Sequence, residues 1–119
     1  SYWEPAAAAI HQLRTSGVGG MGHGGEFETS FQLATRPELV HMDRLEGVYA
    51  PLVGWDLVAP GAPSRTYRRR PTPDTNHASI FGDPHKANAE IGEKMLQAAV
   101  DGLVEMFENL QPAYEERKK

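Results

Sequence analysis

The stretch from Gly22 to Ser30 contains the side chains in this sequence that are best suited to carry out a reaction. It reads Gly-His-Gly-Gly-Glu-Phe-Glu-Thr-Ser, and it places one imidazole, His23, close to two carboxylates, Glu26 and Glu28. Glycines on both sides of the histidine allow a tight turn and a close approach of the backbone to a ligand. Because imidazole can transfer protons near neutral pH, the stretch predicts a hydrolytic site.

A helix is expected directly after the histidine. The run that begins at Glu26 has no helix breaker, and its apolar residues recur at the spacing of one helical face. Pro37 disfavours helical geometry at the residue before it, so this helix is expected over 26–35. The unpaired N–H groups and the positive dipole at its start favour negative charge beside His23.

The same residues also have an ordinary structural explanation. Acidic residues in the first turn stabilise a helix, and a histidine in a glycine-rich loop is commonly a solvated loop residue. The glycines between Ser16 and Gly25 fit a flexible linker, and they lack the lysine that would complete a phosphate-binding loop. Taken alone, the residues leave a catalytic and a structural interpretation open.

Longer sequence strings give a resemblance to a known family. The stretch 22–30 is similar to the signature His-Ala/Gly-Gly-Glu-x-Glu-Thr-Ser of the creatininase family of metal-dependent amidohydrolases, and the residues after it extend the match with Arg36-Pro37-Glu38-Leu39-Val40 and Met42-Asp43. A second match lies at Phe81-Gly82-Asp83-Pro84 and Ala87-Asn88-Ala89-Glu90, and Tyr2-Trp3 resembles the segment ahead of the family's site. The resemblance covers nearly the whole chain.

The resemblance implies a three-layer α/β/α fold, in which this chain supplies the C-terminal half with a long final helix. Family members are considerably longer, and an N-terminal half with a Glu-x-His pair, absent from this sequence, provides most of their metal ligands. The chain is therefore expected to need a partner, either an N-terminal half or a second subunit. The assembled unit is expected to form a homo-oligomer, which the family suggests is a hexamer.

The resemblance also assigns roles to the residues that match the signature. It makes His23 the catalytic proton shuttle, gives Glu28 to metal ligation or to orienting the metal's ligands, and places Glu26, Gly24 and Gly25 in the substrate or metal shell. The implied cofactor is a pair of divalent ions, Zn, Mn or Fe, held mostly by residues outside this chain. The implied reaction is hydrolysis of a small-molecule substrate at a cyclic or non-peptide amide C–N bond. The alternative is a noncatalytic structural or regulatory subunit.

Composition sets broader bounds on the protein. A chain of 119 residues suits one domain, and its net charge of −4 disfavours a nucleic-acid partner, which calls for a basic surface. No apolar run approaches the ~20 residues that span a bilayer, so no membrane role is expected. The absence of cysteine excludes disulfides and thiolate chemistry. No secretory signal pattern is visible, and the cytoplasm is the expected location.

The expected elements follow the chain in order. Residues 1–25 are expected to form a strand end at Tyr2-Trp3, a helix from Pro5 and a glycine-rich loop, and residues 26–58 the helix after the histidine and short strands. Residues 59–87 are expected to form an irregular loop, with a short strand at 77–81. A closing helix over 88–110, capped by Asn88 and stopped by Pro112, is expected to pack its apolar face on a sheet.

Several other residues are candidates for a functional site. Ser1 could act as an autoprocessed N-terminal nucleophile, which would explain the missing half. The basic cluster at 65–70, with Arg65 and Arg68 to Arg70, fits a solvated loop, a contact to an acidic partner or a clamp for an anionic substrate. His41, His77 and His85 lie outside the family signature and are expected to be surface or packing histidines.

Overall fold

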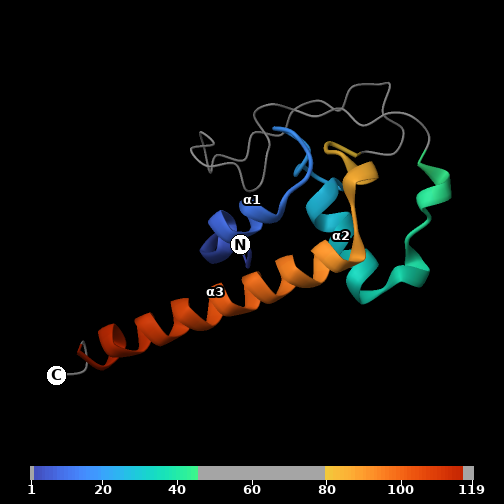
Figure 1. Ribbon diagram of the computed structural model, residues 1–119. Coiled ribbons are helices and arrows are strands. Elements are labelled where there is room, and N and C mark those ends of the chain that lie inside the picture. The colour runs from blue at the N-terminus through green and yellow to red at the C-terminus, as the bar shows by residue number, and fades with distance from the viewer. Residues whose placement is uncertain (1, 46–79, 117–119) are drawn as a thin grey trace.

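The computed structural model describes residues 2–45 and 80–116, and in these ranges the chain is helical (Figure 1). Within these two ranges, three α-helices and four short 3-10 helices follow one another. Their bounds are η1 (Glu4–Ala6), α1 (Ala7–Leu13), α2 (Glu26–Thr35), η2 (Pro37–Leu39), η3 (Met42–Arg44), η4 (Pro84–Lys86) and α3 (Ala89–Glu116). None of the described helices is long and apolar enough to cross a membrane.

The expected three-layer α/β/α fold is wrong for the part of the chain that the structure describes, because those ranges contain helices and no strand. The strand end expected at Tyr2-Trp3 is a turn that leads into η1, with Pro5 in the first positions of that helix. Proline fits there because its φ is already helical and its missing N–H has no intrahelical partner. Most of the strands expected over 45–58 and 77–81, and of the loop expected over 59–87, lie outside the described residues.

Local sequence signals set the ends of the helices around the candidate site. Helix α2 runs over Glu26–Thr35, as the sequence predicts, and η2 begins at Pro37. The side-chain oxygen of Asn88 accepts hydrogen bonds from the N–H groups of Glu90 and Ile91, at 2.8 and 3.2 Å, which confirms Asn88 as the N-cap of α3.

The end of α3 differs from the prediction. The helix continues to Glu116, past Pro112, which was expected to stop it. Proline removes one N–H group from the helix and crowds the preceding turn, a cost of about 3 kcal/mol in a helix interior. Near a helix end this cost falls on one turn only, and the helix continues beyond it.

The hydrophobic core lies where α1, α2 and the first half of α3 meet. Tyr2 and Trp3 pack here as well, with ring centroids 6.5 and 5.9 Å from that of Phe27. This packing is the second reason that the N-terminal aromatic pair does not extend as a strand. The buried core residues are Ala6, Ile10, Met21, Phe27, Met95 and Ala99, with Trp3, Leu13, Phe31, Ile91 and Ala98 packed against them.

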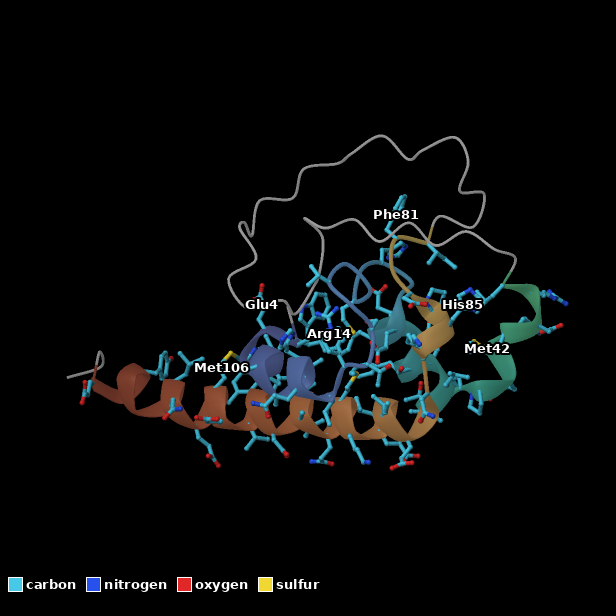
Figure 2. All side chains as sticks on the ribbon, turned by 45° about the horizontal axis from the view of Figure 1, so that its top comes forward. Glu4, Arg14, Met42, Phe81, His85 and Met106 are labelled. Carbon is cyan, nitrogen blue, oxygen red and sulfur yellow. The ribbon has the colours of Figure 1, made fainter. Side chains whose placement is uncertain are left out.

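Helix α3 is longer than the body that it packs on. Its first half contacts α1, η1 and α2, whereas its C-terminal half continues away from these helices (Figure 1; Figure 2 shows the same arrangement with side chains). Val100, Val104, Phe107 and Leu110 are exposed on it. The expectation that the apolar face of this helix packs on a sheet is therefore wrong for the described residues, because its first half packs on helices and its second half is exposed.

Close packing of α2 on α3 depends on Gly92. A Cβ atom at this position would overlap the backbone carbonyl of Ser30 and would crowd the side chain of Ala34. We expect Gly92→Ala to destabilise the protein by about 1–3 kcal/mol, because two packed backbones would have to separate. Gly17 is a matched control, since a Cβ atom there meets nothing within 4 Å. Urea unfolding measures both variants, and equal midpoints for Gly92→Ala and Gly17→Ala would contradict this packing.

Candidate functional site

The glycine-rich loop before α2 is held by a segment from much later in the chain. The N–H of Phe81 donates to the carbonyl of His23 at 2.7 Å, and the N–H of Asp83 donates to the carbonyl of Gly20 at 2.8 Å. The carbonyl of Gly20 also accepts from the N–H of Glu26, at 3.1 Å. The two sequence matches, at 22–30 and 81–84, therefore meet in space and fix the loop that carries His23.

Glycine is required where these two segments touch. A Cβ atom on Gly25 would overlap the carbonyl of Gly20, and one on Gly82 would lie 2.5 Å from the Cα atom of Gly25. Both residues are buried. Gly25 and Gly82 thus let the two backbone segments pass each other at van der Waals distance. A side chain at either position would prevent this contact.

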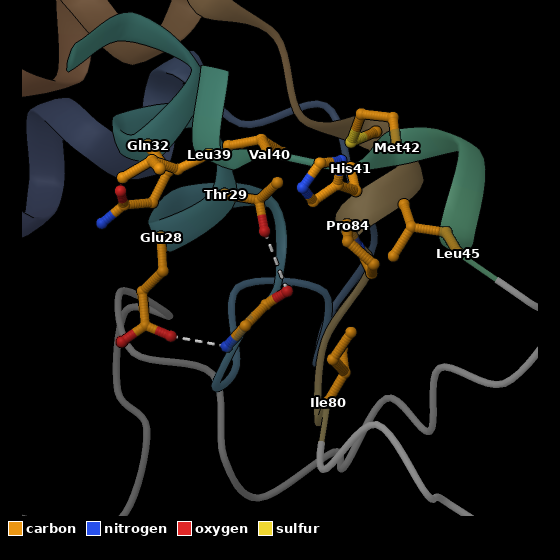
Figure 3. A pocket seen from close by; sticks show the side chains of 11 residues that line it. Glu28, Thr29, Gln32, Leu39, Val40, His41, Met42, Leu45, Ile80 and Pro84 are labelled. Carbon is orange, nitrogen blue, oxygen red and sulfur yellow. Dashed lines mark hydrogen bonds between the residues drawn. The ribbon is translucent and has the colours of Figure 1, made fainter. Parts of the chain in front are cut away.

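Gly24 gives the loop its turn. Its φ of +63° lies in the left-handed region, which glycine adopts without strain. The N–H of Gly24 donates to Oε2 of Glu28 at 2.5 Å, and its carbonyl accepts from the hydroxyl of Thr29 at 3.0 Å (Figure 3). Two side chains in the first turn of α2 therefore hold the backbone of Gly24, the residue after His23, by hydrogen bonds. These bonds fix the backbone from which the histidine side chain extends.

His23 and Glu28 form a pair. Nδ1 of His23 lies 3.3 Å from Oε2 of Glu28, and the two side chains are 65% and 34% exposed. A carboxylate at Nδ1 favours the tautomer that carries its proton there, and it leaves Nε2 as the nitrogen that can bind a ligand or accept a proton. The pair has the geometry of a histidine oriented by a carboxylate, which occurs in general bases and in metal ligands.

Tyr2 lies close enough to this pair to respond to its charge. Burial, and to a smaller extent the negative charge of Glu28, raises the pKa of the Tyr2 phenol above its ordinary value. The phenol therefore stays protonated at neutral pH.

Glu26 is directed into the protein. Its side chain is fully buried, and Oε1 accepts from the N–H and the hydroxyl of Thr15 at 2.7 and 2.8 Å, while Oε2 accepts from the N–H of Ser16 at 2.8 Å. These bonds tie the start of α2 to the chain that leaves α1. The structure thus brings Glu28 to His23, and it gives the carboxylate of Glu26 partners in the loop before the glycines.

A pocket of about 260 Å³ lies beside Glu28 (Figure 3). Apolar side chains from the segment after α2 and from 80–84 form most of its wall, and Glu28, Gln32 and His41 supply polar groups. The lining residues are Gly24, Glu28, Thr29, Gln32, Leu39, Val40, His41, Met42, Leu45, Ile80 and Pro84. Small-molecule sites commonly combine apolar walls with a few polar groups in this way.

The structure places the other candidates as follows. His41 lies at the pocket wall and is exposed, and His85 is exposed on η4. His77 and the arginine cluster at 65–70 lie outside the described residues. Within residues 2–45 and 80–116, no three His, Cys, Asp or Glu side chains converge in an arrangement that could hold a metal ion.

The sequence interpretation missed two features of the site. The pocket wall at 39–45 follows α2 in the chain, but the opposite wall at Ile80 and Pro84 depends on a long-range contact that no local pattern reveals. The burial of Glu26 was also missed. The signal available for it was Thr15-Ser16, two residues able to donate to a carboxylate just after a helix end, but nothing in the spacing links them to position 26.

Comparisons with known proteins agree with the motifs that meet at this loop. A family model described as creatininase, creatinine amidohydrolase, matches residues 1–107. The chain belongs to the creatininase family. A creatinine amidohydrolase of Pseudomonas putida is 36% identical over 110 residues, which cover 88% of this chain and 38% of that relative. No solved structure matches the chain significantly.

Creatininase membership gives the resemblance found in the sequence a firm basis, because the family match includes both segments that form the loop. The chain spans 38% of the length of its Pseudomonas relative. A creatininase-like protein of that size thus contains a large portion with no counterpart in this sequence. The roles assigned to His23, Glu28, Glu26, Gly24 and Gly25 remain predictions.

Proposed function

We propose that this chain is part of a metal-dependent amidohydrolase that cleaves a cyclic or non-peptide amide C–N bond, and that it contributes the His23–Glu28 pair. The contact of 3.3 Å between Nδ1 and Oε2 carries the proposal, since it orients an imidazole at a loop built from the family's own motifs. The printed name of the Pseudomonas relative supports a substrate of the same class.

His23 moves the proton in this reaction. Hydrolysis of an amide requires a proton to leave the attacking water and another to reach the departing nitrogen. Nε2 of His23 is the ring nitrogen that is not held by Glu28, so it accepts the first proton and later delivers it. Glu28 holds the ring and stabilises the imidazolium that forms between these steps, as the acidic member of a catalytic triad does.

The donors on this chain fit a divalent ion. A hydrolytic metal site needs about three protein ligands, and imidazole nitrogen and carboxylate oxygen are suitable ones. Oε1 of Glu28 is the atom offered here, and Nε2 of His23 is kept for proton transfer. A bound Zn, Mn or Fe ion supplies an activated water and polarises the substrate carbonyl. The remaining ligands come from a partner, either an N-terminal half or a second subunit.

The pocket beside Glu28 receives the substrate. At about 260 Å³ it suits a small molecule, and its walls are mostly apolar. Gln32 and His41 lie at the wall and provide hydrogen bonds for orientation. The carboxylate of Glu28 is shared between the pocket and His23, so a substrate in the pocket lies next to the proton-transferring pair.

Metal analysis and amide hydrolysis assays test the proposal. The chain is purified alone and after co-expression with a creatininase-type N-terminal half that carries a Glu-x-His sequence, and creatinine is the first substrate assayed. We expect tightly bound divalent metal and hydrolysis only in the co-expressed material. A stable complex that binds metal and hydrolyses no cyclic amide would contradict the proposed reaction, and a complex without metal would contradict the proposed site.

The noncatalytic alternative is favoured by one observation. The His23 side chain is 65% exposed, as expected of a loop residue that makes no contact with a substrate. In that case the chain is a structural or regulatory subunit. The signature residues then serve only to begin α2 and to let the backbone at Gly25 pack closely on that at Gly82. The two functions differ in the effect of removing the imidazole from the assembled protein.

A further inference from the structure

Asp83 is a buried acidic residue that the proposed reaction does not use. Its exposed fraction is 8%, and it lies in residues 80–85, which we name the 80–85 segment and which pack against the glycine-rich loop. A carboxylate is costly to bury unless hydrogen bonds replace the water that it loses. The protein nevertheless keeps Asp83 inside, next to the loop that carries His23.

The backbone of Asp83 is tied to the start of α2. Its N–H donates to the carbonyl of Gly20 at 2.8 Å, and the same carbonyl accepts from the N–H of Glu26 at 3.1 Å. One oxygen atom thus joins the glycine-rich loop, the first residue of α2 and Asp83. Two residues earlier in the 80–85 segment, the N–H of Phe81 donates to the carbonyl of His23 at 2.7 Å. His23 and Asp83 are therefore connected through the same short segment.

The carboxylate of Asp83 fixes the end of the 80–85 segment that enters η4. Oδ1 accepts from the N–H of His85 at 3.2 Å, and Asp83 is the N-cap of η4. Side-chain caps of this kind hold the backbone at the point where a helix begins. Phe81 and His85, labelled in Figure 2, lie on either side of Asp83 in the chain. Without the cap, the segment loses the side-chain bond that sets its direction into η4.

Close packing connects the position of the 80–85 segment to that of His23. A Cβ atom on Gly82 would lie 2.5 Å from the Cα atom of Gly25. A Cβ atom on Gly24 would lie 3.2 Å from Cγ1 of Ile80. Because closely packed groups transmit small displacements to their neighbours, a shift of the segment also moves the loop. The backbone from which the imidazole of His23 extends moves with it.

We propose that Asp83 is a positioning residue for the His23–Glu28 pair. Its carboxylate caps η4, the capped segment holds the carbonyl of His23 through the N–H of Phe81, and the imidazole stays in contact with Glu28. Asp83 does not line the pocket beside Glu28, so its effect reaches the pair through the backbone. The consequence for catalysis rests on the proposed function, whereas the arrangement itself rests on the hydrogen bonds of the described residues.

The protonation of the His23 ring tests this role without a substrate. Nitrogen NMR of the full chain, labelled with ¹⁵N at histidine and kept in mildly alkaline buffer where imidazole is neutral, reports which ring nitrogen carries the proton. We expect the wild type to carry it on Nδ1, beside Glu28, and Asp83→Ala to distribute it over both nitrogens. Asp83→Asn is expected to match the wild type, because asparagine caps helices as well as aspartate does.

Two further variants complete this NMR experiment. His23→Ala removes one set of ring signals and so assigns them. Asp43→Ala is the matched control, since it removes an exposed carboxylate from the first turn of η3, and it is expected to leave the His23 ring unchanged. Far-UV circular dichroism checks that each variant is folded. A folded Asp83→Ala chain whose His23 proton stays on Nδ1 overturns the proposal, as does a wild type whose proton lies on Nε2.

Amide hydrogen exchange examines the 80–85 segment directly and includes a measurement on the wild type, which does not depend on the folding of a variant. The N–H groups of Phe81 and His85 are expected to show the same opening free energy, because the cap and the bond to His23 open as one unit. In Asp83→Ala, the Phe81 amide is expected to exchange about 2–30-fold faster, which is the range that loss of a helix cap gives. A wild type in which His85 exchanges freely while Phe81 stays protected overturns the proposal.

Turnover of the co-expressed assembly connects this role to the reaction. Asp83→Ala is expected to lower turnover, and Asp83→Asn to keep it near that of the wild type. An assembly in which Asp83→Ala turns over like the wild type contradicts the role of Asp83 and leaves the proposed reaction standing. If the wild-type assembly hydrolyses no amide, the proposed reaction fails, and the ring signal of His23 together with the exchange of Phe81 still decides the role of Asp83.

Discussion

His23→Ala is expected to lower the turnover of the assembled amidohydrolase by about 10²–10⁴-fold, which is the usual contribution of a positioned general acid or base. Substrate binding should change much less, because the pocket is lined by other residues. The fold should not change, since the side chain is 65% exposed and its loop is held through the backbone. Steady-state kinetics of the co-expressed assembly measure the loss.

His85→Ala is the matched control for this experiment. His85 is exposed, follows the pocket residue Pro84 and does not line the pocket, so its removal is expected to leave turnover within a few-fold. If His23→Ala gives the same small effect, the imidazole has no part in the reaction, and the noncatalytic interpretation of the chain is correct.

Glu28→Gln separates positioning from proton transfer. Glutamine can still accept from the N–H of Gly24, which keeps the loop turn, but it removes the negative charge beside Nδ1 of His23. We expect a loss of about 10–100-fold, as found for the partners that orient histidines in metal sites. If Glu28 were purely structural, Glu28→Gln would lower the amount of folded protein and leave the turnover of the folded fraction unchanged.

Local rules predicted the parts of the fold that depend on a few neighbouring residues. Helix α2 begins and ends where the glycines and Pro37 indicate, and Asn88 caps α3 through its own side chain. Each of these signals is satisfied within about one helical turn. They do not depend on the way in which the helices are packed, so the sequence is sufficient.

The parts that failed depend on contacts between distant residues. The strand end at Tyr2-Trp3 was inferred from aromatic residues at the chain start, but the rings pack on Phe27 of α2 and the backbone turns into η1. The expected sheet came from resemblance to a family fold of which this chain spans a limited part. Without the rest of such a fold, the apolar pattern of α3 shows which residues avoid water, and it does not show what covers them.

Within the candidate site, the sequence singled out His23, Glu26 and Glu28 but did not predict the directions of their side chains. His23 and Glu28 are five positions apart, and a turn at Gly24 followed by the first turn of α2 brings their side chains together. Glu26 was grouped with them because it also lies in the signature. Side chains two positions apart lie on different sides of a helix, and this separation sends Glu28 to the loop surface and Glu26 into the protein.

The buried position of Glu26 leads to the largest expected effect on stability. Glu26→Ala would leave three buried or partly buried donors, two on Thr15 and one on Ser16, without their acceptor. Each unsatisfied group costs about 1–3 kcal/mol, so the expected destabilisation is about 3–5 kcal/mol after some relaxation. That is a large part of the 5–15 kcal/mol that typically stabilises a domain. Urea unfolding followed by circular dichroism measures the change in midpoint.

Two further variants make this result specific. Thr15→Val removes the hydroxyl that donates to Oε1 and keeps the side-chain shape, so it should cost about 1 kcal/mol. Glu38→Ala, at an exposed carboxylate on η2, should cost almost nothing. If Glu26→Ala instead unfolds like the wild type but the assembly loses its metal or its activity, then the carboxylate must leave Thr15 and Ser16 to serve the metal or substrate. In that case the structural role inferred from its three hydrogen bonds is wrong.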